Sequence, residues 1–543
     1  MGLVLVACVL LALAGCSKHA PAGGDQILRL SQRNEPASLD PQVASLPDEF
    51  FVIRALSEGL VLPIPDGVGQ NPVDVVPGAA LAWETSPNGL VWTFHLRPDG
   101  RWSNGDRVTA GDFVATIRRA INPALAPPKA PLFFGLKNAE AFYRGTLADA
   151  SQVGAAAPND RTLVLTLEHP VPELLSLAAS GPWLPVHAAT VAQFGDNRGS
   201  PWTRPGNFVG NGPFVLTEWR PHELISVRRN PFFRGATRVH LDGIDFQVYD
   251  DENTEERAFR AGQVDVTMTV PVSKIGSYAP PVLHAQPLAE TRFLSLNVRK
   301  PPLNDSRVRR ALFLAIDRGA LVRSVLKGGQ QPAETYIPPG LGGYWPALGR
   351  EGGPAAWDPA TVKISPAGRA ADEARRLLGE AGFPGGRGFP VLEVSTWTAN
   401  PVIEAVQQMW RQELGIETTI VRREAKVHVA ALRTGDYAIG FLPAIPDYGD
   451  PSSLFNELVT GAAGNYPQWS NARYDALVAE AGRTMNAGAR LSVYQKAEQI
   501  LLADLPVVPL YFNSQSYLVA PRVGTWRSDR LWNRFYTEVT LHP

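Results

Sequence analysis

The stretch WTFHLRPDGRWSNGDRVTAGDFVATIRR, residues 92–119, combines a strand, a turn and a capped helix. Its first six residues alternate between apolar and polar side chains, as in a half-buried strand, and residues 99–105 are rich in turn-forming residues. Thr109 and Asp112 have the spacing of a capping box, and Phe113 opens a run of apolar residues at helical spacing. The stretch therefore predicts a strand that leads through a turn into a helix.

Strand and helix patterns alternate along the rest of the chain. Short apolar or alternating runs predict strands at residues 26–31, 163–167, 214–219, 224–229, 244–249, 293–297, 392–396 and 417–422. Apolar residues at three- and four-residue spacing predict helices at residues 170–179, 254–261, 307–326, 370–381 and 403–414. This alternation predicts a layered α/β architecture.

The composition is that of a folded soluble protein of more than one core. The chain has 543 residues, of which 45% are apolar and 19% are charged, so two or three substructures are expected. The formal net charge is −1, whereas a phosphate-binding surface needs an excess of clustered basic residues. The cluster Arg307, Arg309 and Arg310 has the spacing of a solvated helix face. We therefore expect no nucleic-acid partner.

The first sixteen residues resemble a bacterial lipoprotein signal peptide. An apolar run too short to span a bilayer ends in the lipobox-like sequence Leu13-Ala14-Gly15-Cys16. Cys16 would become the lipidated first residue of the mature chain, and residues 17–24 would form a flexible tether. No Lys or Arg precedes the apolar run, which departs from the usual signal pattern and leaves the start codon open. A buried N-terminal helix is the alternative interpretation.

The cysteine content fits the same interpretation. Cys8 would leave with the signal peptide, and Cys16 would carry the lipid. The mature protein would then contain no pair of thiols that can form a disulfide. The predicted location is the periplasmic side of the cell envelope, with the chain attached to a membrane through its lipid.

Two acidic residues occupy a loop that leaves an apolar segment. Residues 441–456, FLPAIPDYGDPSSLFN, change from an apolar run to a loop rich in Pro and Gly that carries Asp447 and Asp450. A partly buried carboxylate in such a place needs a cation as partner. An Asp in a turn is more often a capping residue, so the residues alone leave both roles open.

Common motifs of enzymes and metal sites are absent from the sequence. It contains no His-Glu-x-x-His, no Gly-x-Ser-x-Gly and no Gly-Lys pair that would close a phosphate loop. The nine histidines are scattered, and no two have metal-ligand spacing. We therefore expect a protein that is not an enzyme and that binds neither a metal nor another cofactor.

Several segments together resemble the oligopeptide- and dipeptide-binding proteins of bacterial ABC importers, which form extracellular solute-binding protein family 5. The resemblance extends over nearly the whole mature chain, and the segments occur in the family's order. Beside residues 92–119, the matching segments are SLDP at 38–41, SEGL at 57–60, NGPF at 211–214, RAGQVD at 260–265, PLND at 302–305, RVRRAL at 307–312 and GDY at 435–437.

The resemblance implies an α/β, two-lobed periplasmic-binding-protein fold of type II, cluster C, with an additional smaller domain. Carried over to this chain, lobe I would comprise residues 25–52, 182–289 and 513–543, the extra domain residues 53–181, and lobe II residues 290–512. A lobe assembled from both ends of the chain requires at least two crossings between the lobes. Such crossings are what a hinge needs.

The resemblance also implies a function. A monomer would capture short peptides between its lobes by hinge closure and deliver them to the membrane subunits of an ABC permease. An extended peptide can pair with exposed strand edges, and a carboxylate can hold its ammonium group by a charge-assisted bond of about 1.5 to 3 kcal/mol. Asp447 aligns with the ammonium-binding aspartate of the family, and Glu35 falls where the family contacts the peptide backbone.

Four further residues are weaker candidates for contacting a ligand. Arg433 falls near a basic cluster that meets the peptide carboxylate in some members of the family, although a solvated helix end is the alternative. Trp397 and Tyr511 are candidates for lining side-chain pockets, although aromatic residues beside strands are more often core residues. Tyr448 directly follows Asp447 in the binding loop.

Two positions depart from the family pattern and leave an alternative ligand class open. Ala444 stands where the family commonly has a Trp, and Lys426 replaces a second aromatic residue. The loss of these two aromatic walls favours the same fold with a non-peptide ligand, such as a sugar, a metal chelate or an antimicrobial. A sensor without a transport role is a further form of this alternative.

Overall fold

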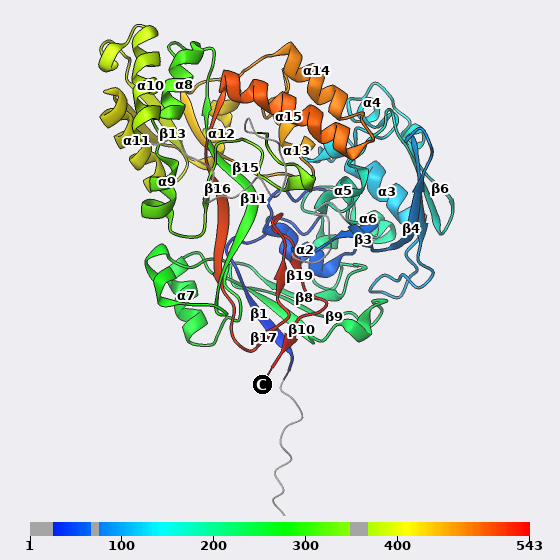
Figure 1. Ribbon diagram of the computed structural model, residues 1–543. Coiled ribbons are helices and arrows are strands. Elements are labelled where there is room, and N and C mark those ends of the chain that lie inside the picture. Colours follow the sequence, from blue (N-terminus) through cyan, green and yellow to red (C-terminus); the bar gives the residue numbers. More distant parts are fainter. Residues whose placement is uncertain (1–24, 67–74, 348–366, 543) are drawn as a thin grey trace, which may run out of the picture.

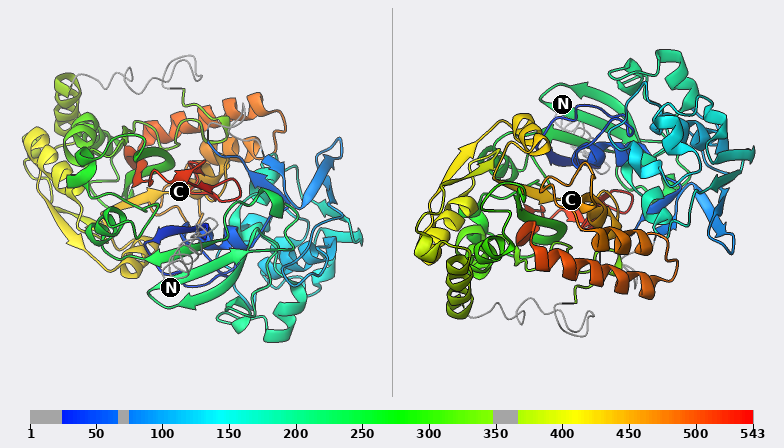
Figure 2. Two further views of the ribbon diagram at one scale, coloured as in Figure 1. Left: turned by 90° about the horizontal axis from the view of Figure 1, so that it is seen from below. Right: turned by 90° about the horizontal axis from the view of Figure 1, so that it is seen from above.

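The computed structural model describes residues 25–66, 75–347 and 367–542, which form three main sheets with helices packed around them (Figure 1). Figure 2 shows the four-stranded sheet of residues 80–166 at one end of the molecule and the strands of residues 392–422 at the other. The predicted mixed α/β fold is confirmed. Within the described residues, no helix is long and apolar enough to cross a membrane.

The first sheet brings together segments that are far apart in the sequence. Strand β1 (Ile27–Gln32) lies parallel to β10 (Gly243–Val248), and β9 (Leu224–Arg229) and β8 (Phe214–Arg220) continue the sheet in antiparallel order. The carboxylate of Asp265 accepts hydrogen bonds from Arg29 of β1 and from Arg522 near the C-terminus, with distances of 2.8 Å to each guanidinium. Three separate stretches of chain are thereby joined by one buried carboxylate.

The second sheet contains the strand that precedes the capped helix. It is antiparallel throughout, in the order β4 (Ala80–Thr85), β5 (Val91–Leu96), β7 (Thr162–Thr166) and β6 (Ala155–Asn159). Helix α3 (Ala110–Ala120) packs against β6 and β7. The predicted capping box is confirmed, since the Asp112 carboxylate accepts a hydrogen bond from the Thr109 amide at 2.8 Å and the Thr109 hydroxyl accepts one from the Asp112 amide.

The third and largest sheet has six strands. Their order is β12 (Gln331–Pro332), β16 (Val507–Leu518), β11 (Leu283–Leu296), β15 (Ile439–Ala444), β13 (Leu392–Thr396) and β14 (Thr418–Arg422). The main helices around this sheet are α8 (Ser306–Leu314), α10 (Ala367–Glu380), α11 (Pro401–Leu414), α12 (Ala425–Thr434), α14 (Ala472–Ala481) and α15 (Ala487–Asp504). Two buried apolar clusters fill the space between this sheet and its helices.

Strands β11 and β16 form one long antiparallel pair that connects the six-stranded sheet with the region of β1 and β10 (Figure 1). Beyond the end of β16, Val519 forms a bridge to Val266, which also bridges to Leu30 of β1. The predicted lobe boundaries at residues 289/290 and 512/513 fall inside these two strands. Those boundaries stay a prediction.

One expectation for this region is wrong. Residues 307–326 do not form one helix, because α8 ends at Leu314 and a new turn begins after Asp317, whose side chain accepts a hydrogen bond from the Ala320 amide at 2.8 Å. The predicted strand at 293–297 is confirmed up to Leu296, as the end of a longer strand that starts at Leu283. The apolar periodicity continues across the helix break and therefore did not reveal it.

A turn at Asn211 and Gly212 holds the chain that directly follows helix α2 (Glu49–Leu56). The side-chain amide of Asn211 accepts a hydrogen bond from the Glu58 amide and donates one to the Glu58 carbonyl, both at 2.8 Å. A Cβ atom on Gly212 would lie 2.4 Å from the amide nitrogen of Ser57, so only glycine fits there. The matching segments SEGL and NGPF are thus one structural unit.

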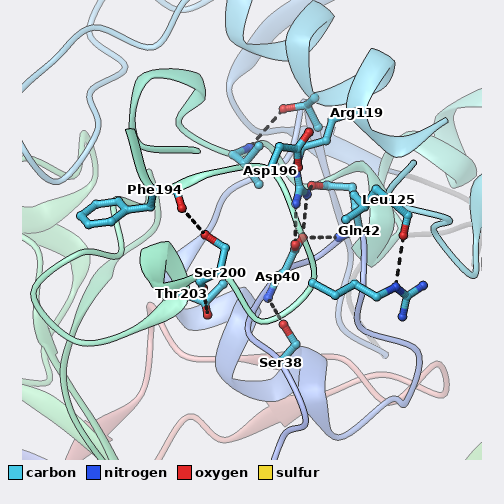
Figure 3. A network of polar contacts seen from close by, with 12 residues as sticks. Ser38, Asp40, Gln42, Arg119, Leu125, Phe194, Asp196, Ser200 and Thr203 are labelled. Atoms are coloured by element: carbon cyan, nitrogen blue, oxygen red, sulfur yellow. Dashed lines mark hydrogen bonds and ion pairs between the residues drawn. The ribbon is translucent and has the colours of Figure 1, made fainter. Parts of the chain in front are cut away.

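A buried guanidinium ties the extra domain to the N-terminal segment. Figure 3 shows Arg119, at the end of α3, pointing toward Asp40, Gln42 and Asp196. Its two terminal nitrogens donate to the two carboxylate oxygens of Asp40 at 2.8 and 2.6 Å, and its Nε donates to Asp196 at 2.7 Å. Gln42 continues the network by donating to the carbonyls of Pro182 and Leu184.

We predict that Arg119→Met lowers the free energy of unfolding by about 3 to 5 kcal/mol, because it leaves the buried Asp40 carboxylate without its cation. Urea denaturation of the variant and the wild type checks this. Arg144→Met is the matched control, since Arg144 forms an exposed pair with Glu140 that contributes less than about 0.5 kcal/mol. Equal effects of the two substitutions would contradict the prediction.

Candidate functional site

A cavity of about 260 Å³ lies where the three parts of the chain meet. Lobe I here means the part around the first sheet, the extra domain the part around the second, and lobe II the part around the third. The lining residues include Phe50, Arg54, Asp529 and Arg530 from lobe I, Asp66, Lys129 and Ser176 from the extra domain, and Leu341, Asp447 and Tyr448 from lobe II. A ligand in this cavity would touch all three parts.

Asp447 lies in the loop that follows strand β15 and faces the cavity. Its backbone amide donates to the Ser453 hydroxyl at 2.8 Å, which fixes the start of the loop. Its carboxylate oxygen Oδ1 accepts a hydrogen bond from Lys129 Nζ at 2.6 Å. The cation beside Asp447 thus comes from the extra domain, at the position where the resemblance predicts a peptide ammonium.

A second carboxyl group lies close to this ion pair. Glu457 accepts a hydrogen bond from the Tyr336 hydroxyl at 3.1 Å. Burial, together with the nearby charge of Asp447, raises the pKa of Glu457 to about 8. Glu457 is therefore mostly neutral at pH 7 and adds little negative charge to the pair of Lys129 and Asp447.

Tyr448 anchors the Asp447 loop in the extra domain. Its side chain is 7% exposed and packs in the apolar cluster that contains Phe94, Phe133 and Trp183, although the residue itself belongs to lobe II. Its hydroxyl forms a hydrogen bond with the Ser452 hydroxyl at 3.0 Å. The main contribution of Tyr448 is therefore to hold the loop, while part of the residue also lines the cavity.

A buried ion network holds the same loop from its other side. Arg490 of α15 donates to the two carboxylate oxygens of Asp450 at 2.6 and 2.7 Å and to Glu173 of the extra domain at 3.1 Å. These three side chains are 10% exposed or less. Burial and the charge of Asp450 raise the pKa of Glu173 to about 7. The network joins lobe II to the extra domain independently of the exposed pair at Asp447.

The other charged side chains that line the cavity differ in how many hydrogen bonds they form. The Asp529 carboxylate accepts hydrogen bonds from the amides of Leu531 and Asn533 and from the Asn533 side chain. Arg54 and Arg530, in contrast, donate to the carbonyls of Ala179 and Pro339, and neither forms an ion pair within the described residues. Each guanidinium has five N–H donors, so the cavity retains spare donor capacity.

The other predicted ligand residues do not line this cavity. Glu35 accepts hydrogen bonds from Trp219 Nε1 at 2.8 Å and from the His222 amide at 3.1 Å, so it faces the β8–β9 hairpin. Arg433 is exposed on α12 and borders a separate shallow surface hollow. The structure brings together Asp447 and Tyr448, and it places Glu35 and Arg433 elsewhere.

Trp397 and Tyr511 pack inside lobe II. Trp397 stacks on Phe441 with ring centroids 5.8 Å apart. Tyr511 lies in β16 and is 6% exposed, and burial raises its pKa to about 12. Of the two positions that depart from the family pattern, Ala444 is a buried residue opposite Thr291 in the sheet, and Lys426 lies on α12 beside the same hollow as Arg433.

Several site residues were missed by the sequence analysis. Lys129 follows two prolines after the capped helix. Prolines restrict the backbone of the loop, so a single cation held there was the available sequence signal for a site residue. Its partner Asp447 lies 318 positions later, and Glu173 and Arg490 are 317 positions apart. No pattern in the sequence reveals pairs at such separation, because the fold alone brings them together.

Two further expectations concern a metal and a lipid. Within the residues that the structure describes, no group of three or more His, Cys, Asp or Glu side chains is arranged to hold a metal ion. Cys16 and the tether at 17–24 lie outside the described residues. Their predicted roles therefore stay predictions.

We predict a pH-dependent contribution from Glu498, which supports the cavity-lining loop at residues 340–342. Its buried carboxyl accepts hydrogen bonds from the Tyr344 hydroxyl at 2.5 Å and the Ile337 amide at 3.2 Å, and burial raises its pKa to about 7. The native state therefore binds this proton more tightly than the unfolded state does. The stabilising effect of protonation is present at about pH 5 and is lost as the pH rises through about 7.

Urea denaturation of wild type and Glu498→Gln at pH values from about 5 to 8 checks the prediction, because the variant lacks this titration. The stability of the wild type relative to the variant should fall as the pH rises. Glu480→Gln, an exposed substitution on α14, is the control and should change stability by less than about 0.5 kcal/mol. A constant difference between wild type and Glu498→Gln would contradict the prediction.

Comparison with known proteins places this architecture among binding proteins. Residues 74–466 match the family described as bacterial extracellular solute-binding proteins, family 5 Middle. The chain is 33% identical to a probable deoxycholate-binding periplasmic protein of Escherichia coli, over 96% of this chain and 94% of the relative. It is 31% identical to the periplasmic oligopeptide-binding protein of Salmonella typhimurium, over 98% and 96% of the two chains. The structure of the Escherichia coli murein tripeptide binding protein superimposes with a TM-score of 0.79 at 29% identity, covering 96% of this chain and 99% of that chain.

Proposed function

Because the chain belongs to the family 5 bacterial extracellular solute-binding proteins, we propose that it captures short peptides between its lobes and delivers them to an ABC importer. The observation that carries this proposal is the position of Asp447, whose carboxylate faces a cavity lined by all three parts of the chain. The similarity to the oligopeptide-binding protein supports the ligand class. The proposed role is binding and delivery, without a catalytic step.

The proposed contact for the peptide ammonium is the Asp447 carboxylate. Lys129 shows that this carboxylate accepts an ammonium group, because its Nζ lies 2.6 Å from Oδ1. A charge-assisted bond of this kind contributes about 1.5 to 3 kcal/mol. A ligand that bridges the lobes would favour the closed arrangement, which the membrane subunits would recognise.

A non-peptide, anionic ligand is the second candidate. It is favoured by the same contact, since Lys129 already neutralises Asp447 and the neighbouring guanidiniums retain unused donors. The relative at 33% identity whose name refers to deoxycholate supports this class as well. Binding assays that compare peptides with organic anions distinguish the two candidates.

We further propose that a monomer acts on the periplasmic side of the cell envelope and is anchored by a lipid on Cys16. The lipobox-like sequence supports the anchor, and the names of the relatives support the compartment. Expression of Cys16→Ser tests the anchor, since the variant should move from the membrane fraction to the soluble fraction. An unchanged distribution would contradict lipid anchoring.

We predict that Asp447→Asn weakens binding of short peptides by at least about tenfold, because it removes the charge that holds the ammonium. Purified protein is freed of bound ligand by unfolding and refolding, and calorimetry and thermal shift then measure binding of free and N-acetylated peptide libraries. Free peptides should bind and acetylated peptides should bind more weakly. Mass analysis of recovered peptides should find them intact.

Asp436→Asn is the matched control, because Asp436 is exposed in lobe II and lies outside the cavity. It should bind peptides like the wild type. Binding of neither library would overturn the peptide proposal and favour the anionic candidate. Equal binding of both libraries would overturn the role of Asp447 as the ammonium site.

A further inference from the structure

The pair of Lys129 and Asp447 is an ion pair that a ligand can reach. Its two side chains come from the extra domain and from lobe II, and they are 29% and 36% exposed. Asp450, three residues after Asp447, belongs instead to the buried network of Arg490, Asp450 and Glu173. A ligand can therefore exchange partners with the first pair while the second keeps the loop in place.

Entry of an ammonium group at Asp447 disturbs the charge balance of the cavity. Lys129 and the ligand would then bring two cations to one carboxylate. Arg54 and Arg530 also line the cavity, and their hydrogen bonds go to backbone carbonyls. Like charges at close range in a partly closed cavity are unfavourable.

The carboxyl groups near Lys129 do not offer it an equal second partner. Asp529 is occupied by three hydrogen bonds from its own loop. Glu457 is hydrogen-bonded by Tyr336, and burial raises its pKa to about 8. Asp66 is exposed and lies in the field of Arg530. A displaced Lys129 is therefore best compensated by an anionic group that the ligand itself brings.

We infer that Lys129 sets the ligand specificity of this cavity: the ligand ammonium replaces it on Asp447, and Lys129 then binds a carboxylate of the same ligand. This inference rests on the proposed peptide-binding function and deepens it. After the exchange, Asp447 pairs with the ligand ammonium and Lys129 pairs with the acidic side chain of the ligand. The ligand class is short peptides with an acidic side chain near the amino terminus.

The position of the acidic group follows from the contact distance. Lys129 Nζ starts 2.6 Å from the carboxylate oxygen that the ligand ammonium would take. After the exchange it remains close to that ammonium, so the matching carboxylate belongs to the first or second residue of the peptide. An acidic side chain farther along the peptide would lie too far from Lys129 Nζ to pair with it.

The test compares tripeptides that carry Glu or its neutral isostere Gln at position one, two or three. Binding is measured by calorimetry on the ligand-free full chain and on three variants. Lys129→Met removes the cation, and Lys129→Arg restores a cation at the same position. Lys137→Met is the matched control, because Lys137 is exposed in the extra domain and does not line the cavity.

The wild type is expected to prefer Glu over Gln by about tenfold at position one or two, and by much less at position three. Lys129→Met should lose this preference and bind the Gln peptides more tightly than the wild type does, because no lysine competes for Asp447. Lys129→Arg and Lys137→Met should keep the preference.

Binding of Glu and Gln peptides with equal affinity by the wild type would overturn the inference while leaving the peptide function intact. A preference for Glu peptides that persists in Lys129→Met would also overturn the inference, since a group other than Lys129 would then bind the acidic side chain. If no peptide of either kind binds the wild type, the proposed function itself fails, and the two failures are thus distinguishable.

Discussion

The contacts across the cavity depend on the paired strands β11 and β16, which carry the chain from the six-stranded sheet into lobe I. Between the pairs Pro287–Ser514 and Thr291–Phe512, three residues of β11 face one residue of β16. A bulge of this kind interrupts the hydrogen-bond ladder locally while the strands remain continuous. The paired strands are therefore continuous but irregular at two places, here and between Arg292 and Phe293, and a movement between lobes needs local irregularities of this kind.

The ion pairs that hold the fold together and the ion pair at the cavity differ in how deeply they are buried. The pairs of Arg119 with Asp40 and of Arg490 with Asp450 are almost fully buried and hold segments of different parts together. The pair of Lys129 and Asp447 has the same chemistry but is partly exposed at the cavity. A buried pair is costly to break, whereas an exposed pair contributes little and exchanges easily. Identical residue types thus serve as framework in one place and as a binding surface in another.

Local patterns predicted local structure well, and long-range contacts escaped them. The capping box at Thr109 and Asp112 and the strands at 224–229 and 392–396 were correct because neighbouring residues determine them. The prediction of one helix at 307–326 was wrong because Asp317 caps a new helical turn without interrupting the apolar periodicity. At the site, Asp447 was identified through resemblance to a family. Lys129 was not, since its role depends on a residue 318 positions away.

The burial of Tyr448 has a consequence for how such a protein can diversify. The loop that carries Asp447 belongs to lobe II, yet its anchor Tyr448 packs in the apolar core of the extra domain, which also supplies Lys129. A recombination that replaced the extra domain alone would remove both the apolar cluster in which Tyr448 packs and Lys129, the partner of Asp447. A chimera of this chain that keeps both contacts must therefore exchange the extra domain together with the loop at residues 446–452.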